Sequence, residues 1–566
     1  MGKKVVIIGV SSIFLVAMVV AAVVVGVNRH SSTTDPSAAA DSAKSGELSA
    51  TAKAVQTLCQ PTDYKEACEK SLASANTTDP KELMKLAFKA AMHEVALAFK
   101  NSTELEKANT DDKTGQALST CNEALDSAID NLQQSFDKIG AFDLSKVDDY
   151  INDVQTWLTS SYSYGVMCID AFEWNTTESD KAKAEMEKAL KSAKELTSNA
   201  LVMVNQVDKV LGSFNIQKPQ STTTTTRRLL SDDGFPTWMN AGMRRLMKAP
   251  AKNIRADVIV AKDGSGRYKK LSDAVKNIPV RNDNRTYVIY VKAGVYDELV
   301  IVEKKQTHVM IIGDGPDKTK ITGRLNAVDG VGTFKTGSFK ALGSNFIARD
   351  IGFENTAGSE KHQAVALHVG SDMSVFYNCR IDAFQDTLLT AAGRQFYRDC
   401  TISGTVDFIF GYGSAIFQNC KLLIRKPMEN QQCMVTADGR EDKHLASGIV
   451  IHNSIITAAP DMAPVKRNFK SYLGRPWKPL ARTVVINSQI DDVIHPDGWM
   501  PWAGSNHDKT CFYGEYGNRG LGANTSRRIG WSKKLTKNQA MFFTVRRFID
   551  GSKWIPKSGV PFVSGL

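Results

Sequence analysis

A short degenerate pattern recurs through the second half of this chain and limits its fold more than any other feature. Each copy begins with Asn or Asp and ends, three positions later, on an aliphatic or aromatic residue. The copies begin at Asp350, Asn378, Asp399, Asn419, Asn453 and Asn487, at intervals of 28, 21, 20, 34 and 34 residues. Irregular periods of this size in β-rich sequence punctuated by Gly indicate a solenoid. Alternating apolar and polar residues, as from Arg482 to Ile486, indicate single β-helix coils, with an antiparallel β-sandwich as the alternative.

Two aspartates occupy the same offset in consecutive copies of this repeat. Asp386 follows Ile381 by five residues, and Asp407 follows Ile402 by five. In a coiled parallel sheet, equivalent positions of neighbouring coils lie about 4.8 Å apart. Two carboxylates at that distance cannot both ionise freely, so one pKa should rise while the other stays low. Such a pair suits a general acid combined with a nucleophile or base.

The N-terminus carries a long apolar segment. Residues 5–27 are 23 uncharged, mostly aliphatic positions after Lys3 and Lys4. This length can span a bilayer and exceeds the usual core of a signal peptide. We therefore expect residues 1–50 to be a signal anchor with a Ser/Thr/Ala-rich stalk, with a cleaved signal peptide as the alternative. Either directs the chain into the secretory pathway, and five glycosylation sequons agree: Asn76, Asn101, Asn175, Asn284 and Asn524.

Residues 51–215 differ in character from the repeat region. They are rich in Ala, Leu, Lys and Glu, nearly free of Pro and Gly, and have helical apolar spacing. This pattern predicts an all-α four-helix bundle, with one helix starting near Asp79-Pro80. A basic, Thr-rich linker follows at 216–256, and the β-solenoid occupies 257–566. The net charge of +11 favours an acidic partner, but the linker holds much of the excess, so charge alone does not identify that partner.

Nine cysteines in an oxidising compartment suggest disulfides with one thiol left over. Cys379, Cys400 and Cys420 occupy the same position in three copies of the repeat and should form a ladder. The coil spacing lies within the Cα separation that a disulfide tolerates. We therefore predict a Cys400–Cys420 disulfide, with a ladder of free buried thiols as the alternative.

Several longer motifs follow one another in the second domain. They are Gly294-Val-Tyr-Asp-Glu298, Gly332-Thr-Phe334, Gln363-Ala-Val-Ala-Leu367, Gln385-Asp-Thr-Leu388, Asp407-Phe-Ile-Phe-Gly411 and Leu473-Gly-Arg-Pro-Trp477. Over nearly all of 257–566 the chain resembles the plant pectin methylesterases. The resemblance implies a right-handed parallel β-helix that hydrolyses methyl esters of pectin (homogalacturonan) with no metal or other cofactor. The helical domain resembles the pectin methylesterase inhibitor domain, which implies disulfides Cys59–Cys68 and Cys121–Cys168.

The resemblance also implies a role for individual residues. Asp407 would be the nucleophile and Asp386 the general acid, then base. Gln363 and Gln385 would stabilise the oxyanion. Arg475 would hold Asp407 ionised, by depressing its pKa, and contact a substrate carboxylate. Trp477 would pack on a sugar ring, and Thr333 would donate a hydrogen bond to substrate.

The linker contains a dibasic motif similar to the family's pro-region cleavage site. It comprises Arg227, Arg228, Leu229 and Leu230. Its presence implies a subtilisin-like processing protease as a partner, an inhibitor domain acting in cis until cleavage, and a destination in the extracellular cell wall; no nucleic acid is expected as a partner. Read from composition alone, the same stretch could be a basic spacer.

Two other functions remain compatible with the residues. Carboxyl groups about 5 Å apart also suit a retaining glycosidase acting on pectin. The chain could also be a non-catalytic pectin-binding or inhibitor protein. Two departures from the family pattern bear on substrate preference: Leu389 stands where an aromatic is usual, and Tyr412 follows the Asp407 motif in place of Asn. We expect these to change substrate pattern or affinity, not the chemistry.

Overall fold

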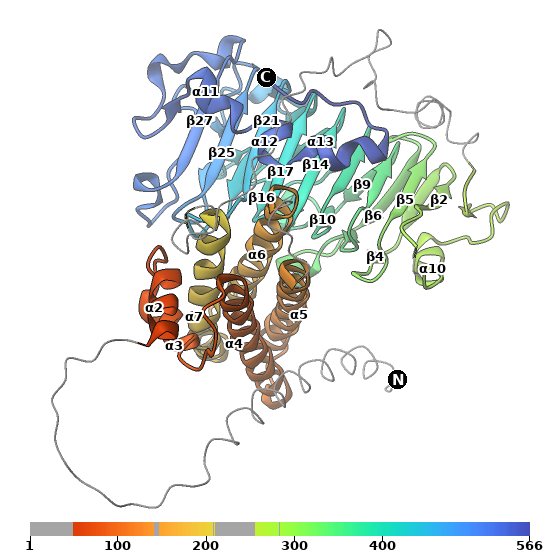
Figure 1. Ribbon diagram of the computed structural model, residues 1–566. Coiled ribbons are helices and arrows are strands. Elements are labelled where there is room, and N and C mark those ends of the chain that lie inside the picture. Colours follow the sequence, from red (N-terminus) through yellow and green to blue (C-terminus); the bar gives the residue numbers. More distant parts are fainter. Residues whose placement is uncertain (1–48, 141–146, 208, 210–254, 282) are drawn as a thin grey trace, which may run out of the picture. The chain divides into compact units, whose positions relative to one another are not determined.

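The computed structural model describes residues 49–140, 147–207, 209, 255–281 and 283–566. The chain divides into two compact units, 1–221 and 222–566, of which the first is helical and the second is built from strands (Figure 1). The predicted anchor at 5–27 and the linker motif at 227–230 lie outside the described residues. Within the described part of the chain, no helix combines the length and apolar character needed to cross a bilayer.

The helical unit contains the predicted four long helices. They are α4 (Pro80–Ala108), α5 (Asp112–Gly140), α6 (Val147–Asp170) and α7 (Thr177–Asn205), preceded by the short helices α2 (Ala50–Cys59) and α3 (Lys65–Ser71). Helix α4 begins where the sequence indicates, because the Asp79 carboxylate accepts a hydrogen bond from the Lys81 N–H and Pro80 occupies the first turn. Each long helix packs against at least two of the others, which buries one apolar stripe of each in a common core.

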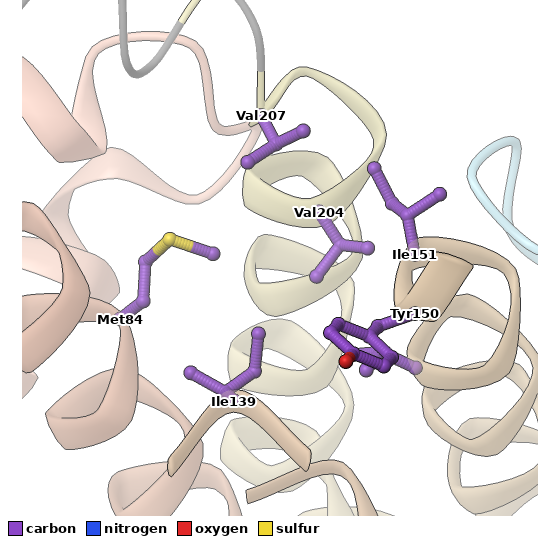
Figure 2. Close-up of a pocket in the computed structure, with 7 residues that line it drawn as sticks. Met84, Ile139, Tyr150, Ile151, Val204 and Val207 are labelled. Atoms are coloured by element: carbon purple, nitrogen blue, oxygen red, sulfur yellow. The ribbon is translucent and has the colours of Figure 1, made fainter. Parts of the chain in front are cut away.

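Two disulfides fasten this bundle. Cys59–Cys68 joins α2 to α3, and Cys121–Cys168 joins α5 to α6, which are the pairings that the resemblance implies. Figure 2 shows a small pocket at the end of the bundle, where Met84, Tyr150 and Val204 are among the lining residues. Its lining is apolar apart from the tyrosine, so it is a packing gap between helices.

The second unit is a parallel β-helix of three long sheets. The first sheet is β1 (Val258–Val260), β2 (Tyr287–Val291), β5 (Val309–Gly313), β8 (Ile347–Arg349), β11 (Ser374–Tyr377), β14 (Arg394–Arg398), β17 (Ser414–Gln418), β21 (Gly448–His452), β25 (Arg482–Ile486), β27 (Phe512–Tyr516) and β28 (Lys533–Lys534). The second is β3 (Gly294–Asp297), β6 (Thr319–Gly323), β9 (Gly352–Asn355), β12 (Arg380–Asp382), β15 (Thr401–Gly404), β18 (Lys421–Ile424), β22 (Ile455–Ala458) and β26 (Gln489–Ile490). The third is β4 (Val300–Val302), β7 (Phe339–Ala341), β10 (Leu367–Val369), β13 (Leu388–Thr390), β16 (Ile409–Gly411), β20 (Thr436–Asp438) and β24 (Arg475–Pro476). Strands β19 (Cys433–Met434) and β23 (Ser471–Tyr472) form a separate pair.

The sequence repeat is the register of the second sheet. The closing residues of the six copies are aligned and buried: Phe353, Ile381, Ile402, Leu422, Ile456 and Ile490. Every pairing between strands of the described residues is parallel, which excludes the antiparallel sandwich. The solenoid prediction is therefore confirmed.

The structure also explains why each copy opens with Asn or Asp. All six opening residues have positive φ, between 47° and 57°, at the turn from the first sheet to the second. Among residues with a side chain, Asn and Asp tolerate this left-handed conformation best. The side chains also form ladders, since the Asn378 amide donates to the Asp350 carboxylate and the Asn419 amide to the Asp399 carboxylate.

The predicted Cys400–Cys420 disulfide is wrong. Cys379, Cys400 and Cys420 are all free thiols buried in the core, and the Cys400 Sγ lies 3.4 Å from the Phe376 carbonyl oxygen. Side chains stacked on parallel strands point the same way, so their Cβ atoms keep the strand spacing of about 4.8 Å. A disulfide needs Cβ atoms about 3.8 Å apart. The Cα separation of neighbouring coils allows a disulfide, but the separation of their Cβ atoms does not.

The remaining helices cover parts of the solenoid. Helix α10 (Leu271–Lys276) adds Leu271 and Ala274 to the core at its N-terminal end. Helices α11 (Lys537–Met541), α12 (Val545–Phe548) and α13 (Gly551–Trp554) belong to a C-terminal segment that packs on the outer face of the first sheet (Figure 1).

Candidate active site

The two aspartates predicted to carry the chemistry lie in equivalent turns of neighbouring coils. Asp386 lies between β12 and β13, and Asp407 between β15 and β16. Each precedes by two residues a member of the register pair Leu388–Ile409. The Asp386 N–H donates to the Val406 carbonyl at 3.0 Å, which links the two turns. The structure therefore brings the two carboxyl groups to one place on the solenoid.

Both aspartates have a left-handed backbone, with φ of 61° at Asp386 and 49° at Asp407. Both residues are nearly buried, at 8% and 5% exposed. Asp tolerates this conformation better than most residues with a side chain, as it does at the openings of the repeat. The turn before Asp407 is closely packed, since a Cβ added at Gly404 would lie 2.2 Å from the Phe408 Cβ.

Arg475 reaches Asp407 from 68 residues further along the chain. It belongs to β24, and its Nε donates to the Asp407 Oδ1 at 2.9 Å while its Nη2 donates to the Oδ2 at 2.5 Å. This two-point contact fixes the orientation of the carboxylate. The Tyr513 hydroxyl donates to the Arg475 carbonyl at 2.7 Å and so supports the strand that carries the guanidinium.

The electrostatics of Asp407 differ from the expectation. Burial raises the pKa of the Asp407 carboxyl above its ordinary value, and the Arg475 guanidinium opposes this without reversing it. The expected net depression of this pKa is therefore wrong, because loss of hydration outweighs the attraction of one cation at so enclosed a position. Arg475 thus limits the rise.

The two predicted oxyanion residues are neighbours in space. Gln363 and Gln385 pair across adjacent coils, and the Ala364 N–H donates to the Gln385 carbonyl at 3.2 Å. Gln385 directly precedes Asp386, so its side chain belongs to the same turn. Both glutamine side chains are half-buried. Amide donors at this place suit stabilisation of an oxygen on which negative charge develops.

Aromatic rings gather beside the aspartates. Trp477 is half-buried and lies 5.0 Å from the Tyr412 ring and 6.1 Å from the Phe410 ring, measured between centroids. Leu389 pairs in register with Phe410. Relative to the family pattern, Tyr412 therefore adds an aromatic ring next to Trp477. Leu389 lacks the usual aromatic ring at a position one coil earlier.

Two residues at this site were missed in the sequence. The Arg475 guanidinium lies 4.2 Å from the centroid of the Trp502 ring. Trp502 follows the last strand of the second sheet, outside the repeat, and no sequence pattern indicates it. Arg425 stacks 3.7 Å from the Phe384 ring centroid and donates to the Ala383 carbonyl at 3.0 Å, next to the turn with Gln385. The repeat could have indicated Arg425. Extending the register of the second sheet aligns Arg425 with Thr405 of the preceding coil and with Phe384 of the coil before that.

Thr333 opens a short 3-10 helix, Thr333–Lys335, and is 5% exposed. The end of this helix is tied to the segment after Gln363, since the Val365 N–H donates to the hydroxyl of Thr336, the C-cap residue, at 3.0 Å. The five sequon asparagines, Asn76, Asn101, Asn175, Asn284 and Asn524, are all exposed. Roles for these residues remain predictions.

Comparison with known proteins gives two family matches along the chain. Residues 257–552 match the family model described as Pectinesterase, and residues 53–203 match Plant invertase/pectin methylesterase inhibitor. The chain is 43% identical to the Arabidopsis thaliana "Putative pectinesterase/pectinesterase inhibitor 28", over 100% of this chain and 75% of that protein. It is 44% identical to "Probable pectinesterase/pectinesterase inhibitor 58" of the same plant, over 100% of this chain and 98% of that protein.

A solved structure agrees with these matches. A pectin methylesterase from carrot is 48% identical, with a TM-score of 0.55, over 55% of this chain and 99% of its own. The pectinesterase match alone spans more than half of the chain. The chain therefore belongs to the pectinesterase family and carries an N-terminal domain of the pectin methylesterase inhibitor type.

Proposed function

We propose that this pectinesterase hydrolyses the methyl esters of homogalacturonan with Asp407 as nucleophile and Asp386 as general acid, then base. The observation that carries this assignment is the two-point contact of Arg475 with Asp407. A cation held on one aspartate of a matched pair keeps that carboxylate ionised and oriented for attack. The other aspartate is left to handle the proton.

The reaction then proceeds in two balanced halves. An Asp407 oxygen attacks the ester carbonyl carbon, and the amides of Gln363 and Gln385 stabilise the oxyanion that forms. The intermediate collapses as Asp386 gives its proton to the departing methanol, which leaves an acyl-enzyme anhydride. Asp386, now ionised, takes a proton from water, and the hydroxide attacks the acyl carbon. Asp407 is released as carboxylate, and the pectin leaves as a carboxylic acid that loses its proton to solvent, which gives the free carboxylate.

Substrate recognition follows from the residues around the pair. Arg475 also contacts a carboxylate of the pectin chain, Trp477 packs on a sugar ring, and Thr333 donates a hydrogen bond to the polymer. The paired glutamines favour ester hydrolysis over glycoside hydrolysis, because an oxyanion requires donors and an oxocarbenium ion does not.

The test is methanol release from highly methylated pectin by the wild type and by Asp407→Asn. The variant should lose methanol release, by about 10³-fold or more if covalent catalysis depends on this carboxylate. Asp399→Asn is the matched control, because this position has the same left-handed backbone and Asn occupies it in other coils. New reducing ends without methanol would show a glycosidase instead, and an equal loss in both variants would remove Asp407 from its role.

The helical domain acts in cis as an inhibitor until the linker is cut by a subtilisin-like protease at Arg227, Arg228, Leu229 and Leu230. Residues 5–27 route this precursor into the secretory pathway, as a signal anchor or cleaved peptide, and the released enzyme works in the cell wall. Support comes from the inhibitor match at 53–203 and from the position of the dibasic motif between the two matched regions. Arg227→Ala/Arg228→Ala should leave an uncut precursor with little methanol release. Arg244→Ala/Arg245→Ala, the second dibasic pair, should still be processed; the opposite result would move the cleavage site.

A further inference from the structure

The C-terminal segment forms the outer layer of the first sheet. Its apolar side chains pack on outward-facing residues of that sheet: Phe562 on Phe396, with ring centroids 6.4 Å apart, and Phe543 on Phe512 at 5.5 Å. The Val563 N–H donates to the side-chain oxygen of Gln418, in β17, at 2.8 Å. The segment therefore crosses the sheet from β27 to β14.

The outward side of this segment is strongly cationic. From 533 to 566 there are seven Lys or Arg and one acidic residue, Asp550, for a net charge of +6 (7 − 1). Asp550 pairs with Lys553. The other six cations are exposed, and none has a carboxylate partner among the residues that the structure describes: Lys533, Lys534, Lys537, Arg546, Arg547 and Lys557. We call these six residues the cationic strip.

Aromatic surface accompanies the charge. The Lys533 ammonium lies 4.8 Å from the centroid of the Phe512 ring, and the Arg547 guanidinium lies 5.2 Å from that of Phe542. The Phe542 side chain is 60% exposed, an unusual state for a large apolar residue. Cations that sit beside an open ring offer one partner for a carboxylate and another for the C–H face of a sugar.

We propose that the cationic strip is a second, non-catalytic binding site for demethylated homogalacturonan. The inference rests on the proposed function, because this polyanion is the product of the proposed reaction. A linear polymer with a carboxylate on every freed residue matches a surface that carries several exposed, unpaired cations. The catalytic aspartates lie at turns into the third sheet, whereas the strip lies on the first, so the product can bind here without occupying the active site. The strip would hold the enzyme on pectin that it has already demethylated.

The test uses the full chain and immobilised polygalacturonate. Lys533→Gln, Lys534→Gln, Lys537→Gln, Arg546→Gln and Arg547→Gln together should weaken binding by about 10–100-fold at low salt and reduce its salt dependence. The matched control neutralises five exposed lysines at the other end of the solenoid: Lys269, Lys270, Lys276, Lys305 and Lys318. This control has the same net charge and should bind close to wild type.

Equal weakening in both variants would overturn the proposal, because net charge alone would then explain binding. Phe542→Ala adds a second readout: it should weaken binding at high salt, where charge is screened, and no change there would remove the sugar contact. Strip-dependent binding to anionic lipid vesicles as strong as that to polygalacturonate would also overturn the assignment. Once the linker has been cut, both five-site variants should release methanol from short soluble esters at the rate of the processed wild type. Failure of methanol release in the processed wild type, with strip-dependent binding intact, would reject only the proposed reaction.

Discussion

At the scale of single residues, the environment of each carboxylate determines its chemistry. Asp407 and Asp438 are both buried, and burial raises the pKa of each. They differ in what opposes the rise: a two-point guanidinium for Asp407, and chiefly backbone N–H donors for Asp438. The first arrangement supports attack by an ionised carboxylate, while the second keeps a carboxyl group inside the solenoid.

Arg475→Gln should shift the acidic limb of the activity profile to higher pH. Burial already raises the pKa of Asp407, and without the opposing guanidinium this pKa rises further. Because the ionised carboxylate is the proposed nucleophile, activity should then begin at a higher pH, and kcat/KM at neutral pH should fall by roughly 10²-fold. Arg475→Lys keeps the positive charge but loses the two-point contact of the guanidinium, so its acidic limb and its kcat/KM should lie between those of the wild type and Arg475→Gln. An unshifted acidic limb in Arg475→Gln would contradict this account.

Asp438→Asn should stabilise the protein at high pH and not at low pH. The Asp438 side chain is fully buried, and burial raises its pKa from 3.8 to about 6. A raised carboxyl pKa favours the protonated folded state, so this stabilisation is full below about pH 4 and is lost as pH rises through about 6. Asn mimics the protonated form and can still accept from the Arg440 and Arg482 N–H groups. We expect the free energy of unfolding of the variant to exceed that of the wild type by about 2–3 kcal/mol at pH 8 and by nothing near pH 4. The same difference between variant and wild type at both pH values, measured by denaturant unfolding, would contradict this account.

At the scale of elements, the turn from β12 to β13 depends on residues of later coils. Arg425 grips this turn from two coils away, through its stack on Phe384 and its bond to the Ala383 carbonyl. The Thr387 hydroxyl donates to the Ser403 carbonyl at 3.0 Å, which adds a third restraint. The position of Gln385 and Asp386 is therefore a property of several coils together.

Arg425→Gln should lower kcat by roughly 10–100-fold with little change in KM. A turn displaced by a fraction of an ångström misplaces the proposed acid and the proposed oxyanion donor, while the proposed sugar contacts stay in place. Arg425→Lys should recover only part of the loss, since a lysine cannot stack as a plane. Arg467→Gln, an exposed arginine elsewhere on the solenoid, is the control and should match the wild type. A rise in KM with unchanged kcat would show substrate contact in place of positioning.

At the scale of the whole molecule, the helical unit and the solenoid are each stabilised internally by different interactions. The bundle carries both disulfides of the described residues, whereas all five free cysteines lie in the solenoid. In the chain-entropy model, closing the 47-residue loop between Cys121 and Cys168 stabilises the fold by about 4 kcal/mol. The solenoid depends instead on its stacked core, including the rings of Phe376, Tyr397 and Phe417.

A reducing agent should therefore lower the thermal unfolding midpoint of one unit only. We expect calorimetry of the full chain to show two transitions, with the bundle transition shifted down by dithiothreitol and the solenoid transition unchanged. Thiol titration of the denatured, unreduced chain should give five free thiols, the nine cysteines less four in disulfides. A result of three free thiols would contradict the structure and would indicate a disulfide in the cysteine ladder.

The amino-acid sequence was enough to predict the solenoid, the bundle and the placement of Asp386 beside Asp407. These follow from short-range rules: the left-handed turn selects Asn or Asp at Asp350 and its equivalents, and stacking repeats the offset of the two aspartates in each coil. The thiol state of Cys400 and the direction of the net pKa shift of Asp407 became clear only from the three-dimensional structure. Both depend on side-chain direction and on the loss of hydration among segments distant in sequence. The contact of Trp502 with Arg475 could not be predicted from the sequence either, because no local pattern indicates that this loop packs against a side chain of another strand.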